Sequence, residues 1–284
     1  MQQDRVTLPV QFCRDGEIFD FKIVGENWDT ITTDNDNARR WRRTNDPDSK
    51  REYVLQDIVT LPVPAAQALP KNASLTRDVV AGISALYLSD NPTDDILRGK
   101  LVSRILEAIG MQYSGRAYGD VQNILTALSC YRVVNQLLYR YNPKTKKTEE
   151  YRATFGFVND YIRKPGESGY EYEMQINRIY ADLLTSNLPR ANMPRETLIH
   201  INNNLRPRVI TPAKNIAYAL AAQRNYKSVK YKADTLNNIA GYQSNKPSKT
   251  IKQVTPLLDV LQPTLIQDYK VDKNNNIIID ITPM

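Results

Sequence analysis

Residues 114–130 read SGRAYGDVQNILTALSC and carry the clearest helical pattern in this chain. Val121, Ile124, Leu125 and Leu128 recur at the i, i+3, i+4 and i+7 spacing, which places their side chains on one face of an α-helix. The spacing therefore predicts a helix over 114–130 with a buried apolar face. The short polar and cationic side chains between these positions are expected to point away from the core.

The segments around this helix predict a regular order of elements. Helices are expected over 72–89 and 96–109, and Gly110 follows the second one in the position that commonly ends a helix. Two strands are expected next, in VVNQLLYRY and YRATFGFVNDYI, joined by the basic turn NPKTKKT. Three helices followed by two strands match the winged-helix order, in which the third helix normally enters the major groove of DNA.

A second copy of this order is expected toward the C-terminus. The pattern predicts helices over 212–222, 231–240 and 248–261, followed by strands over 265–271 and 277–281. A shift of about 130 residues aligns the apolar positions of the two third helices and the glycines that precede those helices. The same shift aligns the turn at 142–147 with the turn at 272–276. The two copies share a pattern rather than sequence identity.

The predicted fold class is α+β, with two tandem winged-helix domains and a short N-terminal β-hairpin extension. The extension is assigned to residues 1–70, the first winged-helix domain to 71–190 and the second to 191–284. Weak alternation of apolar residues within 6–24, on either side of Asp15 and Gly16, predicts the hairpin. The length of 284 residues agrees with about two domains.

The composition argues against much catalytic chemistry. Two cysteines and a single histidine, His200, are too few for a four-ligand zinc site, and His200 is expected to be a packed or surface residue of a helix. No GxxxxGK[ST] phosphate-binding loop is present. We therefore expect no catalytic residue, no metal and no cofactor, and we expect that the protein is not an enzyme. A metal-dependent nuclease built on Asp15, Glu17 and Asp20 is the alternative, although these carboxylates are more simply explained as turn and surface charges.

The sequence also indicates where the protein acts. No stretch approaches the roughly 18 apolar residues that a membrane span requires. The N-terminus lacks the charged and apolar regions of a secretory signal. We therefore expect a cytoplasmic protein without a membrane partner.

Positive charge is concentrated in one stretch of the sequence. The formal net charge is +7, and residues 205–252 contain a single acidic residue, Asp234. The basic residues of this stretch are Arg206, Arg208, Lys214, Arg224, Lys227, Lys230, Lys232, Lys246, Lys249 and Lys252. Such a block favours a polyanion, with nucleic acid preferred over a membrane surface. A solvated basic face that aids solubility is the alternative.

A second basic cluster comprises Arg39, Arg40, Trp41, Arg42 and Arg43. Its arginines could bind phosphate while the tryptophan stacks on a base. They could equally pair with the aspartates on either side of the cluster. The sequence leaves both interpretations open.

The predicted DNA contacts lie on the two third helices and on the turns that follow them. In the first copy the candidates are Ser114, Arg116, Tyr118, Gln122, Asn123, Lys144, Lys146 and Lys147. In the second copy they are Lys246, Lys249, Thr250, Lys252, Gln253 and Lys273. Arginine and amide side chains can recognise bases, lysines favour phosphate contacts, and Gly119 would allow a close approach. An ordinary solvated helix face is the alternative.

Three stretches of the sequence resemble a known family. They are ILEAIG at 105–110 followed by YSGRAY at 113–118, TPAKNIAYAL at 211–220, and the spaced apolar residues of 251–261 with Pro256 among them. Over residues 75–284 the chain resembles plasmid replication initiator (Rep) proteins with tandem winged-helix domains, which bind repeated origin sites called iterons. The residues before this region have no counterpart in that pattern.

The resemblance implies a non-enzymatic, sequence-specific initiator that binds double-stranded DNA at the origin through both winged helices. It also implies a homodimer in a repressive state, origin opening, recruitment of the helicase and other host replication proteins, and a location on plasmid DNA in the bacterial cytoplasm. A winged-helix transcriptional repressor is the nearest alternative. A structural or purely protein-binding module is the third reading.

Overall fold

The helix predicted over 114–130 is present in the computed structural model as α6 (Gly115–Cys130). Its buried face includes Val121, Ile124, Leu125 and Leu128, each exposed by no more than 1%. The 3.6-residue period of the apolar side chains therefore determined both the helix and the side of it that packs.

The structure describes residues 5–9, 30–33, 58–62, 73–130, 132–142, 144–167, 169–186, 190–242 and 247–282. These residues form a mixed α+β structure that divides into two units. The central unit comprises residues 15–106 and 113–188. The C-terminal unit comprises residues 1–14, 107–112 and 189–284.

The helices of the central unit pack beside a three-stranded antiparallel sheet. In chain order the elements are α4 (Ala73–Asp90), β4 (Ile96–Gly99), α5 (Leu101–Ala108), α6, β7 (Val158–Gly166), β8 (Gly169–Ile176) and α7 (Arg178–Thr185). The strand order in the sheet is β4-β8-β7, so the last strand lies between the other two. Leu97, Tyr172 and Met174 lie on the buried side of this sheet, with exposures of 1% or less.

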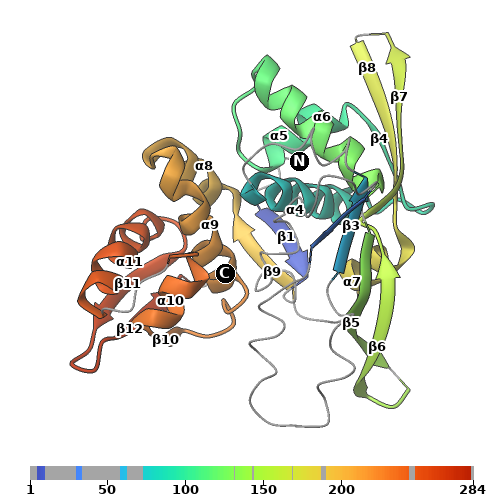
Figure 1. Ribbon diagram of the computed structural model, residues 1–284. Helices are drawn as coiled ribbons and strands as arrows, with labels where there is room; N and C mark the ends of the chain where they lie inside the picture. The colour runs from blue at the N-terminus through green and yellow to red at the C-terminus, as the bar shows by residue number, and fades with distance from the viewer. Residues whose placement is uncertain are drawn as a thin grey trace. The chain divides into compact units, whose positions relative to one another are not determined.

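A separate hairpin is inserted between α6 and β7. It consists of β5 (Arg132–Asn142) and β6 (Lys147–Phe155), which join β2 (Thr30–Thr33) and β3 (Ile58–Pro62) in a sheet of order β2-β3-β5-β6. Figure 1 shows β5–β6 and β7–β8 as two distinct hairpins. The central unit therefore contains a second sheet in addition to its three-helix, three-strand core.

The C-terminal unit repeats the core of the central unit. Its elements are α9 (Pro207–Ala221), β10 (Ser228–Lys232), α10 (Ala233–Ile239), α11 (Pro247–Leu261), β11 (Ile266–Val271) and β12 (Asn276–Ile281). The strand order is β10-β12-β11, so again the last strand lies between the other two. The unit also contains β9 (Arg190–Pro194) and α8 (Arg195–Asn204), which precede α9.

The two cores agree in detail as well as in order. Val158 pairs with Ile176 and is followed by a register shift before Asp160, and Ile266 pairs with Ile281 and is followed by the same shift before Asp268. Both bulges occur at the start of the second strand of the sheet. The repeat expected from the sequence pattern therefore exists as a repeat of topology.

Glycine ends the second helix of each core. Gly110 and Gly241 have φ angles of +67° and +80°, a conformation that glycine adopts without the cost of a Cβ clash. Their N–H groups donate to the carbonyl oxygens of Glu107 and Asn238. This is the helix-ending role that the sequence predicts for both residues.

The prediction of helices over 96–109 and 231–240 was wrong at their N-terminal ends. Residues 96–99 form β4, which pairs with β8, and residues 228–232 form β10, which pairs with β12. Before β4, the φ angle of Asp95 is +57°, and the Asp94 carboxylate accepts a hydrogen bond from the Ile96 N–H. The chain therefore turns into a strand at this point, and the helix begins only at Leu101.

The prediction of a single strand in YRATFGFVNDYI was also wrong. β6 ends at Phe155 and β7 begins at Val158, and both Phe155 and the intervening Phe157 are buried. The break falls at Gly156 and Phe157, and both are buried, so an apolar run that reads as one continuous strand contains it. As a result the turn at 142–147 does not correspond to the turn at 272–276; the β7–β8 turn does.

Two prolines, Pro212 and Pro256, lie inside helices of the C-terminal unit. α9 begins at Pro207 rather than Pro212, its N-cap is Arg206, and Thr211 lies inside the helix. α11 continues without interruption through Pro256, which is exposed. A proline removes one N–H donor from a helix, and on the exposed side water can satisfy the carbonyl that this leaves.

The N-terminal strand β1 (Arg5–Pro9) pairs antiparallel with β9. The second half of the hairpin predicted within 6–24 lies outside the described residues, as does the whole cluster of Arg39, Arg40, Trp41, Arg42 and Arg43. The described part of this segment, β1, pairs with β9 and not with a neighbouring strand. Thr7 and Asn192, whose side chains share a hydrogen bond across this pair, are 185 residues apart in the chain.

Candidate nucleic-acid interface

α6 presents a narrow stripe of small polar side chains on the side opposite its core. Arg116, Asn123 and Thr126 are exposed, as predicted, whereas Gly119 and Gln122 are partly buried. The Arg116 side chain is 93% exposed and lies 3.9 Å from the Asp120 carboxylate, a weak surface pair. The stripe therefore offers one guanidinium and one amide to a ligand, while the Thr126 hydroxyl donates to the Gln122 carbonyl oxygen at 3.0 Å.

The glycines of α6 lie on this open side. A Cβ atom built on Gly115 or Gly119 would meet nothing within 4 Å. Glycine inside a helix costs about 0.5–1 kcal/mol relative to alanine. Packing does not require glycine at position 119, so the helix retains a flat surface there that a ligand could approach closely.

The N-terminus of α6 is held by Ser114. Its Oγ accepts a hydrogen bond from the Ala117 N–H at 3.1 Å, and its carbonyl oxygen accepts one from the Tyr118 N–H at 2.9 Å. The serine therefore acts as a helix cap, and its hydroxyl proton is the group left for a phosphate.

Tyr118, another predicted contact, is turned toward the sheet. Its hydroxyl lies 2.6 Å from the Tyr172 hydroxyl on β8, and burial together with this hydrogen bond raises the pKa of Tyr118 to about 12. The residue therefore links α6 to β8, and its hydroxyl is already engaged by Tyr172.

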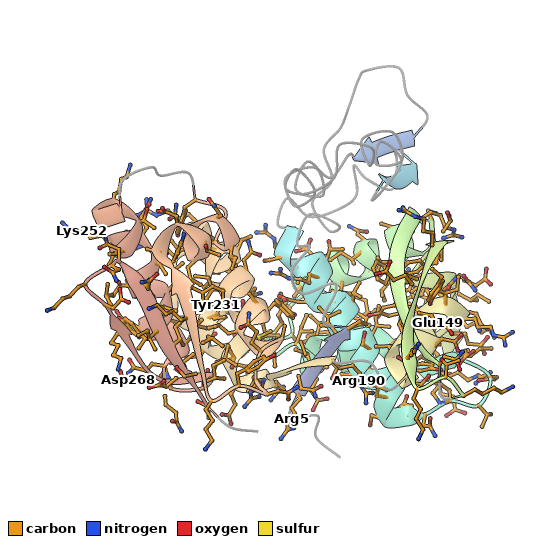
Figure 2. All side chains as sticks on the ribbon, turned by 90° about the horizontal axis from the view of Figure 1, so that it is seen from below. Arg5, Glu149, Arg190, Tyr231, Lys252 and Asp268 are labelled. Atoms are coloured by element: carbon orange, nitrogen blue, oxygen red, sulfur yellow. The ribbon has the colours of Figure 1, made fainter. Side chains whose placement is uncertain are left out.

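α11 presents lysines where α6 presents short polar groups. Lys249 and Lys252 are exposed, and Figure 2 shows Lys252 extending away from the ribbon. The outward orientation expected for Thr250 is wrong, because its side chain is fully buried with Oγ1 3.5 Å from an Asp234 carboxylate oxygen. Gln253 is partly buried, and Lys246 lies outside the described residues.

Lys273 lies in the turn between β11 and β12, which hydrogen bonds to Asp272 hold in place. Asp272 accepts hydrogen bonds from the N–H groups of Asn274 and Asn276 and pairs with Lys230 at 3.0 Å. Hydrogen bonds from Asn276, followed by the Lys230 contact, lower the pKa of the Asp272 carboxyl. Lys273 is exposed at the tip of this turn.

The three lysines predicted for the first copy lie on the inserted hairpin. Lys144, Lys146 and Lys147 are all exposed in the β5–β6 turn, where the Asn142 carboxamide oxygen accepts a hydrogen bond from the Lys144 N–H. The turn of the central unit that matches the Lys273 turn is β7–β8. The hairpin that carries the lysines is therefore not the one that the repeat predicts.

Part of the basic block at 205–252 serves the fold. Lys214 is only 2% exposed, and the Arg224 guanidinium donates to the carbonyl oxygens of Asn192 and Thr282. Burial, with the nearby charge of Arg5, lowers the pKa of Arg224. Lys230 pairs with a carboxylate. The exposed members of the block in the described part of the chain are Arg206, Arg208, Lys227, Lys230, Lys232, Lys249 and Lys252.

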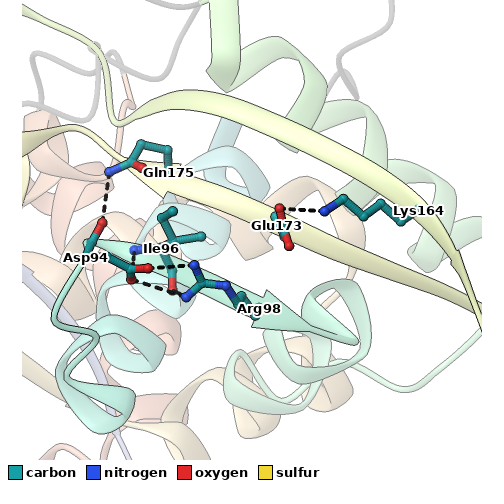
Figure 3. A network of polar contacts seen from close by, with 6 residues as sticks. All are labelled: Asp94, Ile96, Arg98, Lys164, Glu173 and Gln175. Carbon is teal, nitrogen blue, oxygen red and sulfur yellow. Dashed lines mark hydrogen bonds and ion pairs between the residues drawn. The ribbon is translucent and has the colours of Figure 1, made fainter.

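The outer face of the β4-β8-β7 sheet is not basic, because its cations are paired. Arg98 lies 2.6 Å from Asp94, and Lys164 lies 2.8 Å from Glu173 (Figure 3). Hydrogen bonds from Arg98 and Lys164 lower the pKa of the Asp94 and Glu173 carboxyls, respectively. In the central unit the candidate interface is therefore the α6 side and not this sheet face.

Sequence reasoning missed the aromatic side chains of β8. Tyr170 and Tyr172 follow the two-residue period of a strand, which places them on one face of β8. The hairpin that carries them was absent from the prediction, so their proximity to α6 was not foreseen. The alternation YEYEM in the sequence was the available signal.

The described residues hold no group of three or more histidine, cysteine, aspartate or glutamate side chains that could bind a metal ion. His200 lies on α8, partly buried, with Nδ1 3.1 Å from the Asn204 amide nitrogen. Among the helices of the described ranges, none combines the length and apolar character needed to cross a membrane.

Comparison with known proteins gives a loose structural similarity. No family model and no curated protein matches the chain. Among solved structures, a crystal structure of domains 2 and 3 of RctB matches with a TM-score of 0.44 and 10% identity over 96% of this chain and 98% of that chain. A second structure of RctB domains 2–3 matches with a TM-score of 0.44 and 11% identity over 94% of this chain and 96% of that chain.

Proposed function

We propose that this protein is a sequence-specific double-stranded DNA-binding replication initiator with tandem winged-helix domains. In this proposal α6 and α11 are the recognition helices, and each docks in the major groove. The protein is not an enzyme in this proposal, and it acts on plasmid DNA in the bacterial cytoplasm.

One observation carries the proposal: two units of one chain share the order α-β-α-α-β-β and the strand order first-third-second. In each unit the third helix buries one face and exposes a stripe that contains cationic side chains, Arg116 on α6 and Lys249 and Lys252 on α11. A three-helix arrangement that exposes its third helix is suited to the major groove, which admits an α-helix.

The two helices would have different tasks. The amide of Asn123 and the guanidinium of Arg116 match the hydrogen-bonding groups of adenine and guanine. The ammonium groups of Lys249 and Lys252 are suited to phosphates, which fix register and supply affinity. Two such modules in one chain favour a long site, such as a directly repeated origin sequence.

Three further elements of the proposed function go beyond DNA binding. A homodimer in a repressive state, opening of the origin, and recruitment of the helicase and other host replication proteins are implied by the family resemblance of the sequence. Each is a separate event that DNA binding alone does not require.

The experiment is selection of bound fragments from random DNA and from DNA of the source organism. We expect direct repeats, each about two helical turns long, because two docking helices span more than one turn. The Asn123→Ala/Lys249→Ala variant, selected in parallel, should enrich these repeats poorly. A single palindrome would favour the transcriptional repressor, and no enrichment of any sequence would contradict DNA recognition.

A further inference from the structure

A cluster of tyrosines lies between the start of α6 and the β7–β8 hairpin. We define it as Tyr113, Tyr118, Tyr161, Tyr170 and Tyr172. Tyr113 contacts Tyr118 edge to face at 5.9 Å between ring centroids, Tyr118 is hydrogen-bonded to Tyr172, and Tyr172 stacks on Tyr161 at 5.4 Å. Three separate segments of the central unit thus contribute to one aromatic surface.

The two ends of the tyrosine cluster are open to solvent. Tyr113 is 70% exposed and Tyr170 is 49% exposed, whereas Tyr172 between them is 1% exposed. Tyr113 packs on Tyr118, which is hydrogen-bonded to the buried Tyr172. Tyr170 lies two residues before Tyr172, on the same face of β8, with the Arg163 guanidinium over its ring. An exposed tyrosine by itself is ordinary, but two that flank a packed aromatic support are a preformed platform.

Cations accompany the exposed rings. The Arg163 guanidinium carbon lies 3.3 Å from the centroid of the Tyr170 ring, and Arg116, close to Tyr113 in sequence, is almost fully exposed. Lys164 and Glu173 pair with each other, and strand alternation places them on the opposite face of the hairpin. The Asp120 carboxylate lies 3.9 Å from the Arg116 guanidinium.

From this geometry we infer that the tyrosine cluster binds single-stranded DNA by stacking on unpaired bases. The choice of DNA rests on the proposed function. Every base has a π-face on which a tyrosine ring or a guanidinium can stack, and a nearby arginine can neutralise the adjoining phosphate. In a duplex these faces are covered by neighbouring base pairs, so open tyrosine rings have no equivalent partner there.

The test measures the affinity of the full chain for a fluorescent oligothymidylate of about 15 nucleotides, a length within the range that single-stranded DNA sites occupy. Tyr113→Ala and Tyr170→Ala should each weaken binding by at least about fivefold, because stacking on one base contributes roughly 1–3 kcal/mol. Tyr113→Phe and Tyr170→Phe keep the ring and should bind like the unmodified protein. Tyr226→Ala is the matched control, since Tyr226 is 64% exposed but lies in a loop of the C-terminal unit.

The same variants are measured on a labelled duplex, with thermal unfolding as a check of folding. If the alanine variants bind the oligothymidylate more weakly and the duplex with unchanged affinity, the result supports the inference. If the affinities for the oligothymidylate and the duplex fall equally, the inference is overturned, and the tyrosines are contacts to double-stranded DNA. Duplex binding without measurable binding of the oligothymidylate also overturns it and leaves the proposed function intact, whereas failure to bind either DNA contradicts both.

Discussion

A Cβ atom built on Gly110 would lie 2.3 Å from Cγ1 of Ile199, a distance at which one of the two groups must move. Gly110 follows α5 and belongs, with residues 107–112, to the C-terminal unit, as does Ile199 on α8. In the same unit Arg195 donates to the Glu107 carbonyl oxygen at 2.5 Å. Gly241, the corresponding glycine after α10, has nothing within 4 Å of its Cβ position. The two glycines therefore share a conformation but differ in surroundings.

This difference predicts unequal costs for the same substitution. Gly241→Ala should lower the free energy of unfolding by about 1–2 kcal/mol, the cost of a Cβ in the left-handed region. Gly110→Ala should cost more, because the methyl group also displaces Ile199. Chemical denaturation of Gly110→Ala, Ile199→Ala and the double variant measures the coupling between the two positions. Equal costs at both glycines, or additive effects in the double variant, would show that the contact with Ile199 is unimportant.

Lys249 and Lys252 are predicted to contact phosphates. Replacing either with alanine should weaken binding to all duplex sequences similarly and should reduce the slope of log affinity against log salt by about 0.9 per lost contact. The measurement is a salt titration of duplex affinity. Lys227→Ala provides the control, because Lys227 is also exposed but lies in the loop before β10. An unchanged slope in both α11 variants would place the DNA elsewhere.

Asn123 and Arg116 are predicted to recognise bases. Alanine at either position should relax the preference for one base pair of the site. The binding free energy for the preferred site should weaken by about 1–3 kcal/mol, and the affinity for sites with another base pair at that position should change little. Binding to a panel of sites that differ by single base pairs distinguishes this outcome from uniform weakening. Uniform weakening would identify the residue as a phosphate contact instead.

Gly119→Ala should change stability and DNA binding in opposite directions. Alanine removes the helix penalty of glycine, so the free energy of unfolding should rise by about 0.5–1 kcal/mol, since the new methyl group meets no neighbour. On the proposed recognition face the same methyl group should hinder close approach and weaken duplex binding. Thermal unfolding and anisotropy on one preparation give both values, and a stabilised variant with full affinity would contradict close approach at this position.

Asp272 should contribute to stability in a pH-dependent manner. Its folded pKa is lowered, so its contribution is present above its unfolded pKa of about 4 and is lost as the pH falls toward the folded value. Asp272→Asn should therefore be less stable than the unmodified protein at about pH 7, and the difference should narrow at about pH 3. Chemical denaturation of both proteins at the two pH values measures the difference in their free energies of unfolding. A constant difference across the range would show that the charge of the carboxylate has no role.

The α6 prediction and the Thr250 error show where sequence reasoning succeeds and where it fails. Four apolar residues at helical spacing identified the buried face of α6, because that pattern depends only on neighbours along one helix. Thr250 was assigned to the outside by the same geometry, yet it is buried against Asp234 of α10. A small polar residue at the edge of a helix face is compatible with either side, and only the position of the adjacent helix decides between them.

By itself, the sequence determined the local features of this protein: the amphipathic faces of α6 and α11 and the glycines that end α5 and α10. The tertiary structure alone decided that residues 96–99 and 228–232 are strands and that β8 and β12 each lie in the centre of a sheet. It also brought Tyr118 of α6 against Tyr172 of β8, 54 residues away in the chain. Helices are specified by side chains a few residues apart, whereas a short strand is stable only when distant segments supply its hydrogen-bonding partners.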